Sequence, residues 1–374
     1  MRAAVLHKYN VPLELEEVAV EEPRAGEVMV RIAASGICGS DVHLSHGMPD
    51  FGDVLPMVLG HEGAGVIEAV GAGVTDLKRG DRVIISMGAP CGHCDYCGEG
   101  RMQFCNGNPP KSTFGEMEDG SYRLSQGATP VRSFVGIGSL GEYAVVKRRK
   151  VFKFDIDAAF ETMCLISCGV TTGLGAALNS GDIKPGTNVL VFGCGGVGLN
   201  IIQGARIAGA ARIIAVDNNP RKLDMAADLG ATHCVMSPDD PADLVGEVRK
   251  IVPRGVEVAF DAVGMRTDRI QHLMAATDMG GLTLAVGVLP MTETVPVVSR
   301  DLLLGGRRLV GVRGGNGYPG LDIPRILKLY EAKRLKLDEM VGPKFEFEDI
   351  APAFESAAKA DFARTVVRVT PSLL

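Results

Sequence analysis

Cysteine, histidine and carboxylate side chains gather in two short stretches of the N-terminal part of the chain. Cys38 opens the first stretch, and His61 with Glu62 forms the second. Zinc takes thiolate, imidazole and carboxylate ligands, and a catalytic zinc keeps three protein ligands and one open position. The two stretches therefore predict part of a zinc site, with a further ligand coming from elsewhere in the chain.

Four more cysteines follow the pattern C-x2-C-x2-C-x7-C, and they are Cys91, Cys94, Cys97 and Cys105. This spacing lets four thiolates converge on one tetrahedral ion, and a set of four cysteines without an open position is typical of a structural zinc. Iron–sulfur clusters also take four cysteines, but their usual spacings differ. We predict a structural zinc here, with His93 as a surface residue rather than a ligand.

A glycine-rich loop fits the pattern G-x-G-x-x-G and consists of Gly193, Cys194, Gly195, Gly196, Val197 and Gly198. It follows an apolar run at 188–192 and opens a stretch with helical spacing, which is the context of a dinucleotide-binding loop. The first glycine permits a tight turn, the second lets the backbone approach a pyrophosphate, and the third allows helix and strand to pack closely. The helix N-terminus adds N–H groups and positive potential.

Asp217 ends the next apolar run and indicates which dinucleotide binds. An acidic side chain there accepts hydrogen bonds from ribose hydroxyls and repels a 2′-phosphate, which favours NAD over NADP. Arg221 and Lys222 lie just beyond, where a cation could partly accommodate a phosphate, and we include Lys222 among the cofactor-binding residues.

The elements that must position these residues differ between the two halves of the chain. Up to about residue 100, short β segments alternate with glycine and proline, which predicts a mostly-β unit. From Lys184 the pattern becomes strand, helix, strand, which predicts a parallel sheet with crossover helices. A helix at 323–332 and a last strand at 364–370 follow. We expect a long loop without regular structure at 106–137.

Composition sets limits on partners and location. The 374 residues suggest two domains, and a net charge of −6 without an extended basic block argues against a nucleic-acid partner. We expect the one basic run, Lys147–Lys150, to be a solvated turn. The sequence has neither an apolar run long enough for a membrane span nor a secretory signal, so we expect a cytoplasmic protein.

Four cysteines remain for the missing ligand, and they are Cys164, Cys168, Cys194 and Cys234. Only Cys164 and Cys168 lie at the junction between the β half and the nucleotide half. A ligand from this junction would face the nicotinamide end of the cofactor.

Several independent motifs now match one family. The stretch from Gly60 to Val74 fits G-H-E-x2-G-x5-G-x2-V, the four-cysteine lobe fits a second signature, and Ser167–Gly173 reads SCGVTTG. By these motifs the chain resembles the zinc-dependent medium-chain dehydrogenase/reductase family, alcohol dehydrogenase type, over essentially its whole length. The resemblance implies an α/β protein with a GroES-like mostly-β catalytic domain at 1–170, which carries the zinc lobe 91–105. It also implies a doubly wound Rossmann NAD-binding domain at 171–313 and a return to the catalytic domain at 314–374.

The same resemblance implies roles for individual residues. Cys38, His61 and Cys168 would hold the catalytic zinc, Asp41 would orient His61, and Glu62 would approach the metal during ligand exchange. Ser40 and His43 would form a proton relay. Cys164, Cys194 and Cys234 would then be small core residues. The residues implied for cofactor contacts outside the glycine loop are Thr172, Val286, Val288 and Arg364, the last at the pyrophosphate.

Gly39 departs from the family pattern, because many members carry Arg or His there. We expect the missing side chain to weaken NAD binding.

The implied activity is oxidation of primary or secondary alcohols, including aromatic ones, to aldehydes or ketones by hydride transfer to NAD from an alcohol held on zinc. The apolar pocket walls expected by family position are Met87, Phe134, Val135 and Val288, with 47–54 and 106–137 shaping entry. Polyol dehydrogenase of the sorbitol type and glutathione-dependent formaldehyde dehydrogenase remain alternatives, as does a zinc-binding scaffold without enzyme activity. We expect a homodimer that pairs edge strands near 294–298 and 309–312, or a tetramer.

Overall fold

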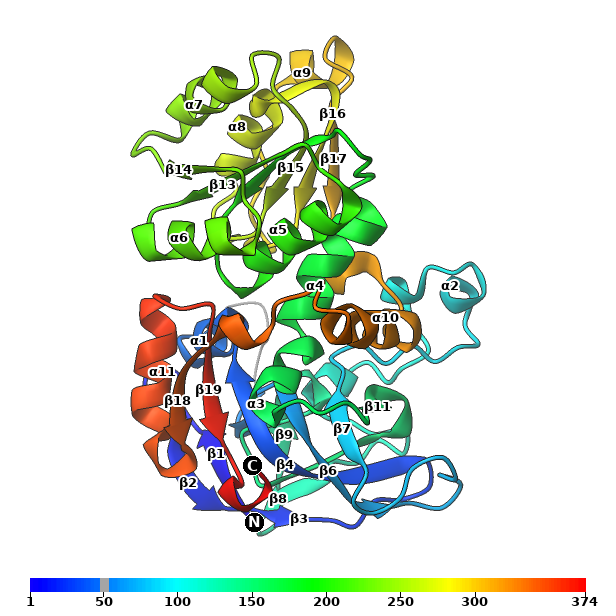
Figure 1. Ribbon diagram of the computed structural model, residues 1–374. Helices are drawn as coiled ribbons and strands as arrows, with labels where there is room; N and C mark the ends of the chain where they lie inside the picture. The colour runs from blue at the N-terminus through cyan, green and yellow to red at the C-terminus, as the bar shows by residue number, and fades with distance from the viewer. Residues whose placement is uncertain (48–53) are drawn as a thin grey trace. The chain divides into compact units, whose positions relative to one another are not determined.

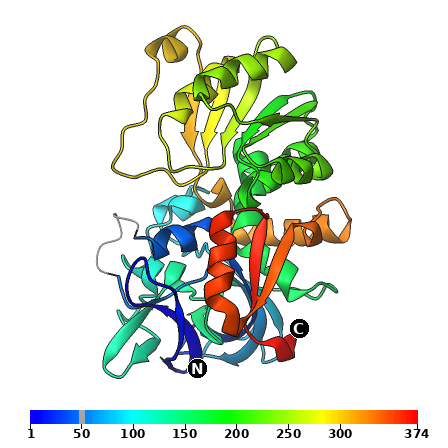
Figure 2. The same cartoon turned by 90° about the vertical axis from the view of Figure 1, so that its left-hand side faces the viewer.

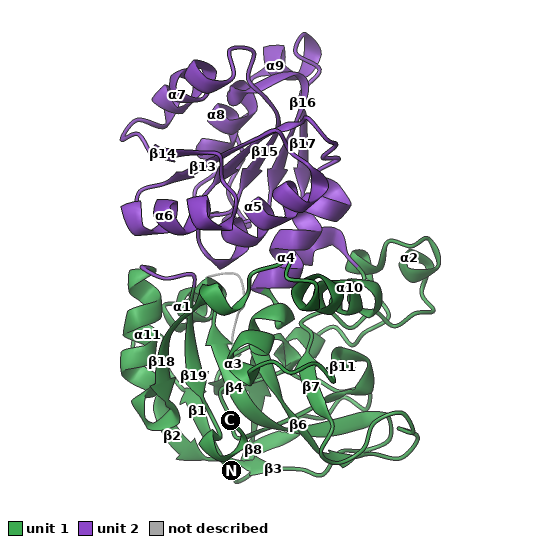
Figure 3. Cartoon of the chain, in the orientation of Figure 1, with its two compact units in different colours: residues 1–168, 318–360, 364–374 green, residues 169–317, 361–363 purple. Residues whose placement is uncertain are grey.

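The computed structural model describes residues 1–47 and 54–374, and they form two compact units (Figure 3). Unit 1 comprises residues 1–168, 318–360 and 364–374, and unit 2 comprises residues 169–317 and 361–363. The chain thus leaves unit 1 after Cys168 and returns to it at Tyr318. Of the expected entry segment 47–54, residues 48–53 lie outside the described residues.

Unit 1 is built on two β-sheets. One has the strand order β2-β1-β5-β9-β8-β3, and the other has the order β11-β7-β6-β4-β19-β18, with β10 also pairing with β4. Alternating apolar residues of these strands meet in a core that includes Val30, Ile32 and Ile67. The strands are β1 (Arg2–Leu6), β2 (Glu14–Glu17), β3 (Ala19–Val20), β4 (Glu27–Ile37), β5 (Met57–Val58), β6 (Glu62–Val70), β7 (Arg82–Ile85), β8 (Leu124–Gln126), β9 (Thr129–Ser133), β10 (Tyr143–Lys147), β11 (Val151–Lys153), β18 (Val341–Glu346) and β19 (Arg364–Arg368).

Short helices connect these strands, and α11 lies along β18 and β19 (Figure 2). The α-helices of unit 1 are α1 (Gly39–Ser45), α2 (Asp95–Gly98), α3 (Phe160–Met163), α10 (Pro319–Glu331) and α11 (Ile350–Lys359). Its 3₁₀ turns include η2 (Met102–Phe104), η3 (Ser112–Phe114), η4 (Phe134–Gly136), η5 (Arg148–Lys150), η6 (Cys164–Ser167), η10 (Asp338–Met340), η11 (Phe347–Asp349) and η12 (Pro371–Leu373).

Unit 2 is a parallel sheet with the strand order β14-β13-β12-β15-β16-β17 (Figure 1). In chain order this is 3-2-1-4-5-6, the order of the Rossmann fold. The strands are β12 (Asn188–Phe192), β13 (Arg212–Asp217), β14 (His233–Met236), β15 (Val256–Asp261), β16 (Thr277–Ala285) and β17 (Arg308–Gly311). The helices are α4 (Gly169–Gly175), a π-helical turn η7 (Ala176–Ser180), α5 (Gly196–Ala208), α6 (Pro220–Leu229), η8 (Pro241–Asp243), α7 (Leu244–Ile251), α8 (Arg269–Ala276), α9 (Ser299–Leu303) and η9 (Gly314–Asn316).

The expectation of an irregular loop at 106–137 is wrong. The segment contains η3 and the antiparallel pair β8 and β9, of which β8 also pairs with β3 and β9 with β5. Leu124 and Val131 of this pair are buried in a small apolar cluster. Glycine and proline mark the turns here, while the strands are stabilised by partners that lie far away in the sequence.

Three smaller expectations also need correction. Residues 294–298 form no strand, so only β17 of the two predicted edges is an edge of the parallel sheet. Lys147 and Lys150 of the basic run are buried rather than solvated, because β10 and η5 carry them into unit 1. Cys234 is exposed on the edge strand β14 and is not a core residue.

Among the described residues, no single helix has the length and apolar character to cross a membrane. One bent pair of segments, 160–167 with 169–180, meets the criteria of length and composition only.

Candidate functional site

The structure brings the chemically active residues of unit 1 together in two groups. In each group the possible ligand atoms lie within 4.8 Å of one another. One group consists of Cys38, His61, Glu62 and Cys168, and the other consists of Cys91, Cys94, Cys97 and Cys105. Both donor sets fit zinc, since thiolate, imidazole and carboxylate are its protein ligands.

Asp41 joins two of the three segments that supply the first group, those of Cys38 and His61. Cys38 caps the N-terminus of α1, and Asp41 is the third residue of that helix. The Asp41 carboxylate accepts hydrogen bonds from the backbone N–H of Cys38 and of Gly60, each at 2.9 Å. It also lies 3.2 to 3.3 Å from Nδ1 of His61. One fully buried carboxylate thus positions both a thiol and an imidazole.

The ring of His61 is oriented through its Nδ1 atom. Because Asp41 lies on Nδ1, Nε2 is the nitrogen that faces the cysteines, which is the arrangement expected of a ligand histidine with a carboxylate behind it. The Ser40 hydroxyl lies 3.4 Å from this Nε2. The ring of Phe134 packs edge-on against His61, with the centroids 5.2 Å apart. Burial alone would lower the pKa of His61, but the Asp41 carboxylate raises it well above its ordinary value.

The two cysteines of this group have opposite acidities. A hydrogen bond from the Cys168 thiol lowers the pKa of Cys38 well below that of an ordinary thiol, and the positive charge of Arg364 adds to the effect. The same bond, together with burial, raises the pKa of Cys168. Cys38 is therefore the more acidic of the two thiols, and a metal ion would displace the protons of both, because zinc binds the thiolate form.

Glu62 completes the group and faces a cation from the far end of the chain. Its Oε2 lies 2.9 Å from Nε of Arg364. Arg364 also donates a hydrogen bond to the carbonyl of Ile37 at 3.2 Å. Burial raises the pKa of Glu62 to about 7 although Arg364 opposes the shift. Gly36, which pairs with Glu62 across β4 and β6, leaves room for this carboxylate, since a Cβ there would lie 2.3 Å from Oε2.

Arg364 contacts a residue that the sequence analysis did not predict as its partner, namely Glu62. The sequence comparison with the family implied a pyrophosphate contact, which stays a prediction. In the structure Arg364 is buried in unit 1 beside Glu62, so its immediate role is to balance negative charge at the metal group. The ion pair between Arg364 and Glu62 follows from the antiparallel register of β19 with β4. The sequence alone does not show that register, so this contact could not be predicted from it.

His43 lies on α1, in the turn that follows Ser40. It is half-buried, and burial lowers its pKa below that of an ordinary histidine. A neutral imidazole near pH 7 is able to accept a proton. His43 is three residues after Ser40 on the same helix, and residues at this spacing are neighbours on a helix surface, which is compatible with the relay predicted for them.

The four-cysteine group is held by backbone N–H groups as well as by sulfur contacts. The N–H groups of His93 and Cys94 lie 3.5 and 3.3 Å from Sγ of Cys91, and Sγ of Cys91 and Cys97 are 4.0 Å apart. The backbone N–H of Cys97 lowers the pKa of Cys94 to about 6, whereas burial raises that of Cys97 to about 12. Such N–H donors favour thiolates and thus a bound cation.

In unit 2 the glycine-rich loop has the geometry of a dinucleotide site. Gly193 has a φ of +97°, and a Cβ on Gly198 would lie 1.7 Å from the Gly193 carbonyl, so both positions require glycine. The loop follows β12 and opens α5, whose first residue is Gly196. The loop therefore lies at the carboxyl end of the sheet, where order reverses between β12 and β15 and where ligands bind in such folds.

Asp217 ends β13 next to this loop. Its carboxylate accepts the backbone N–H of Cys194 at 2.7 Å and that of Asn219 at 3.0 Å. The remaining carboxylate lone pairs are available to ribose hydroxyls.

The other predicted cofactor residues are all in unit 2 except Arg364. Thr172 is buried on α4, and α4 packs against α5, where Val197 lies. Val286 directly follows β16 and is buried, Val288 is 42% exposed, and Lys222 is half-buried on α6.

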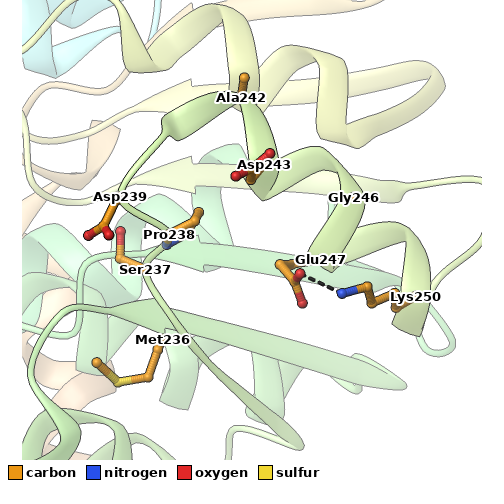
Figure 4. A pocket seen from close by; sticks show the side chains of 9 residues that line it. All are labelled: Met236, Ser237, Pro238, Asp239, Ala242, Asp243, Gly246, Glu247 and Lys250. Carbon is orange, nitrogen blue, oxygen red and sulfur yellow. Dashed lines mark hydrogen bonds and ion pairs between the residues drawn. The ribbon is translucent and has the colours of Figure 1, made fainter.

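A separate pocket of about 610 Å³ lies between the end of β14 and α7 (Figure 4). It is lined by residues from Met236 to Lys250, with Asp239, Asp243 and Glu247 opposite a single lysine. Glu247 and Lys250 pair across one turn of α7 at 2.6 Å. None of the predicted metal, relay or cofactor residues lines this pocket, so we do not assign it to the site.

Known proteins match the chain in both halves. A family model described as the alcohol dehydrogenase GroES-like domain matches residues 24–156, and one described as zinc-binding dehydrogenase matches residues 196–332. Together with the metal groups and the parallel sheet, these matches define a zinc-binding dehydrogenase. The chain belongs to the zinc-dependent medium-chain dehydrogenase/reductase family, alcohol dehydrogenase type, and is an oxidoreductase.

Solved structures resemble it over nearly their whole length. An alcohol dehydrogenase zinc-binding domain protein from Burkholderia ambifaria is 32% identical, with a TM-score of 0.91 and coverage of 99% of this chain and 98% of that one. The benzyl alcohol dehydrogenase of Acinetobacter calcoaceticus is 30% identical, with a TM-score of 0.90 and 99% coverage of both chains. A protein from Sinorhizobium meliloti 1021, solved bound to NADP, is 25% identical, with a TM-score of 0.78 and coverage of 98% and 99%.

Replacement of Cys97 by Ala should lower stability before it lowers activity. A closed four-cysteine zinc contributes folding free energy directly, so we expect the melting temperature to fall by about 10 °C or more. Calorimetry with metal analysis would measure this, with Cys234→Ala, an exposed cysteine outside both groups, as the control. A variant as stable as the wild type but inactive would contradict a structural role.

Replacement of Cys168 and of His43 should separate metal binding from proton transfer. We expect Cys168→Ala to lose the zinc of the first group and all turnover. We expect His43→Ala to keep its zinc and measurable activity, with the pH profile of alcohol oxidation moved to higher pH. The sign follows from the lowered pKa of His43, because the wild-type base is already neutral at pH 7 and the variant must rely on hydroxide. Metal analysis and kcat/KM from pH 6 to 10 test this, and equal losses in both variants would refute the relay.

Proposed function

We propose that this chain is a zinc- and NAD-dependent alcohol dehydrogenase that oxidises primary or secondary alcohols, including aromatic ones, to aldehydes or ketones. The observation that carries the proposal is the buried group of Cys38, His61, Glu62 and Cys168, with possible ligand atoms within 4.8 Å, in a chain that also has a dinucleotide loop. The likeness to a benzyl alcohol dehydrogenase over 99% of both chains supports the substrate class.

In this proposal three residues hold the catalytic metal, namely Cys38, His61 and Cys168. When bound, zinc supplies Lewis acidity, which lowers the pKa of bound water from roughly 15.7 to about 7 and should acidify an alcohol comparably. Asp41 keeps Nε2 of His61 aimed at the group, and Arg364 offsets the negative charge of Glu62. The second zinc, on the four-cysteine group, stabilises its lobe.

Ser40 and His43 move the alcohol proton toward solvent in this proposal. The Ser40 hydroxyl lies next to Nε2 of His61 and is therefore beside the metal position. A positioned acid–base group contributes roughly 10²- to 10⁴-fold to a rate. The relay would therefore contribute less to the rate than zinc does by lowering the pKa of the bound alcohol.

The cofactor is proposed to be NAD, which accepts the hydride. The glycine loop and the N-terminus of α5 would hold the pyrophosphate, and Asp217 would accept hydrogen bonds from the ribose. The NADP bound by the relative from Sinorhizobium meliloti makes this preference worth measuring. Lys222 is the residue that we expect to lessen the preference.

The apolar surroundings of the metal group favour alcohols with hydrophobic tails. Phe134 contacts His61 directly, and the backbone N–H of Met87 donates to the carbonyl of Ser167, the neighbour of Cys168. An apolar wall beside a few polar groups is typical of small-molecule sites.

Purified protein with its metal content measured should oxidise benzyl alcohol and 1-hexanol with NAD faster than it oxidises sorbitol. S-hydroxymethylglutathione should be a poor substrate. Zinc-loaded protein without activity on any alcohol in such a panel would contradict the proposal, and preferential turnover of sorbitol or the glutathione adduct would favour the corresponding alternative.

Asp217→Asn should weaken the preference for NAD by about tenfold or more in kcat/KM, because it removes the charge that repels a 2′-phosphate while an amide oxygen can still accept the N–H of Cys194. Steady-state kinetics with NAD and NADP measure this ratio. Asp224→Asn, on the neighbouring helix α6, serves as the control for a simple change of net charge. A ratio unchanged in Asp217→Asn would refute the assignment.

We also propose a homodimer formed through β17 and α9. β17 is an edge strand of the parallel sheet, and the segment that precedes it in the chain has exposed apolar side chains, among them Leu303 at 82% and Leu304 at 72%. Two copies of one edge can pair around a twofold axis and cover such a patch.

Replacement of both Leu303 and Leu304 by Glu should then give monomers in solution, with the fold retained. Light scattering coupled to size-exclusion chromatography would measure the mass. Leu321→Glu, an exposed leucine on α10, is the control. An unchanged mass in the double variant would locate the interface elsewhere.

A further inference from the structure

Lys150 is a buried lysine that no predicted role explains. It ends the basic turn η5, and only 7% of its surface is exposed. Across residues 1–47 and 54–374, its ammonium forms no ion pair with a carboxylate. Instead, its Nζ donates hydrogen bonds to two backbone carbonyls, those of Met87 at 3.0 Å and Val135 at 2.9 Å.

This arrangement is unfavourable for the lysine itself. Burial and, to a smaller extent, the nearby charges of Lys147 and Arg149 lower the pKa of Lys150 to about 7. A buried ammonium is costly unless strong hydrogen bonds compensate for lost water. The two carbonyls supply such bonds, so Lys150 and the two segments that it joins depend on one another.

The two carbonyls belong to the segments expected to form the substrate wall. Met87 follows β7, and its own N–H reaches Ser167, next to Cys168. Val135 lies in η4 directly after Phe134, whose ring contacts His61. Both segments therefore carry residues within one or two contacts of the predicted metal ligands.

Val135 also needs an external restraint. Its φ is +54° and its ψ is 22°, in the left-handed region that β-branched residues rarely adopt. Such a conformation persists only when surrounding contacts fix it. The bond from Lys150 to the Val135 carbonyl is a contact of this kind.

We propose that Lys150 is a positioning residue that fixes the Met87 and Val135 segments relative to each other and thereby determines which alcohol side chains the site accepts. The selectivity part of this inference rests on the proposed alcohol dehydrogenase function. The positioning part does not, because it concerns only contacts within unit 1.

Three substitutions of Lys150 test whether the hydrogen bonds of its side chain, rather than its apolar stem, position the two segments. Lys150→Met keeps the apolar stem but has no donor, and Lys150→Gln has donors but is too short to reach both carbonyls. Lys150→Arg keeps a long side chain with several donors. The matched control is Arg148→Met in the same turn, because Arg148 pairs with Asp76 and touches neither wall segment.

Hydrogen exchange tests the positioning without any assay of activity. In zinc-loaded protein we expect peptides that cover 84–90 and 131–140 to exchange about tenfold faster in Lys150→Met and Lys150→Gln than in the wild type. Lys150→Arg and Arg148→Met should match the wild type. Unchanged exchange in both shortened variants would overturn the proposal, and the use of two such variants keeps the test decisive if one of them fails to fold.

Kinetics then tests selectivity in the same proteins. We expect the ratio of kcat/KM for benzyl alcohol to that for ethanol to change by about tenfold in Lys150→Met and Lys150→Gln, chiefly through KM for the larger substrate. In Lys150→Arg this ratio should stay close to that of the wild type. A wild type without alcohol oxidation would contradict the proposed function alone, whereas an active enzyme with faster exchange but an unchanged ratio would overturn the role of Lys150 in selectivity.

Discussion

The buried carboxylate of Asp41 is the contact on which the geometry of the metal group depends. It accepts N–H donors from Cys38 and Gly60 and holds the ring of His61. A carboxylate without water is stable only when it is hydrogen-bonded, so the three contacts that stabilise Asp41 also fix two ligands relative to each other. This is possible because Asp41 stands three residues after Cys38, where a side chain in the first helical turn reaches back to the helix start.

Charge balance around that centre comes from opposite ends of the chain. A thiolate and two carboxylates in one buried site repel one another, and Arg364 supplies the compensating cation. Arg364 reaches Glu62 because β19 pairs antiparallel with β4, which ends at Ile37, directly before Cys38. The return of the chain to unit 1 after the parallel sheet therefore completes the metal group electrostatically, although it contributes none of its ligands.

What the sequence could predict depends on how local each feature is. The glycine loop, the four-cysteine lobe and the Cys38–Asp41 pair are each defined by spacings within a few residues, and the alternation of strands and helices after Lys184 predicted the parallel sheet. The strands in 106–137 and the buried state of Lys147 and Lys150 could not be predicted in this way. The residues that pair with these strands and cover these lysines lie in distant segments, and local composition does not show which distant segments will pack there.

The basic turn lies between the two metal groups in a series of contacts. Asn108 donates hydrogen bonds to the carbonyl of Ala89 and to Sγ of Cys105, and its carbonyl accepts one from Arg149 at 2.7 Å. The next residue, Lys150, bonds to the wall that ends on Phe134 and His61. Hydrogen bonds, the peptide links from Arg149 to Lys150 and from Val135 to Phe134, and one ring contact thus connect the four-cysteine lobe with the other metal group, all within unit 1. The four-cysteine group is therefore linked to the proposed active site through the packing of unit 1, so loss of its zinc should affect activity through lost stability.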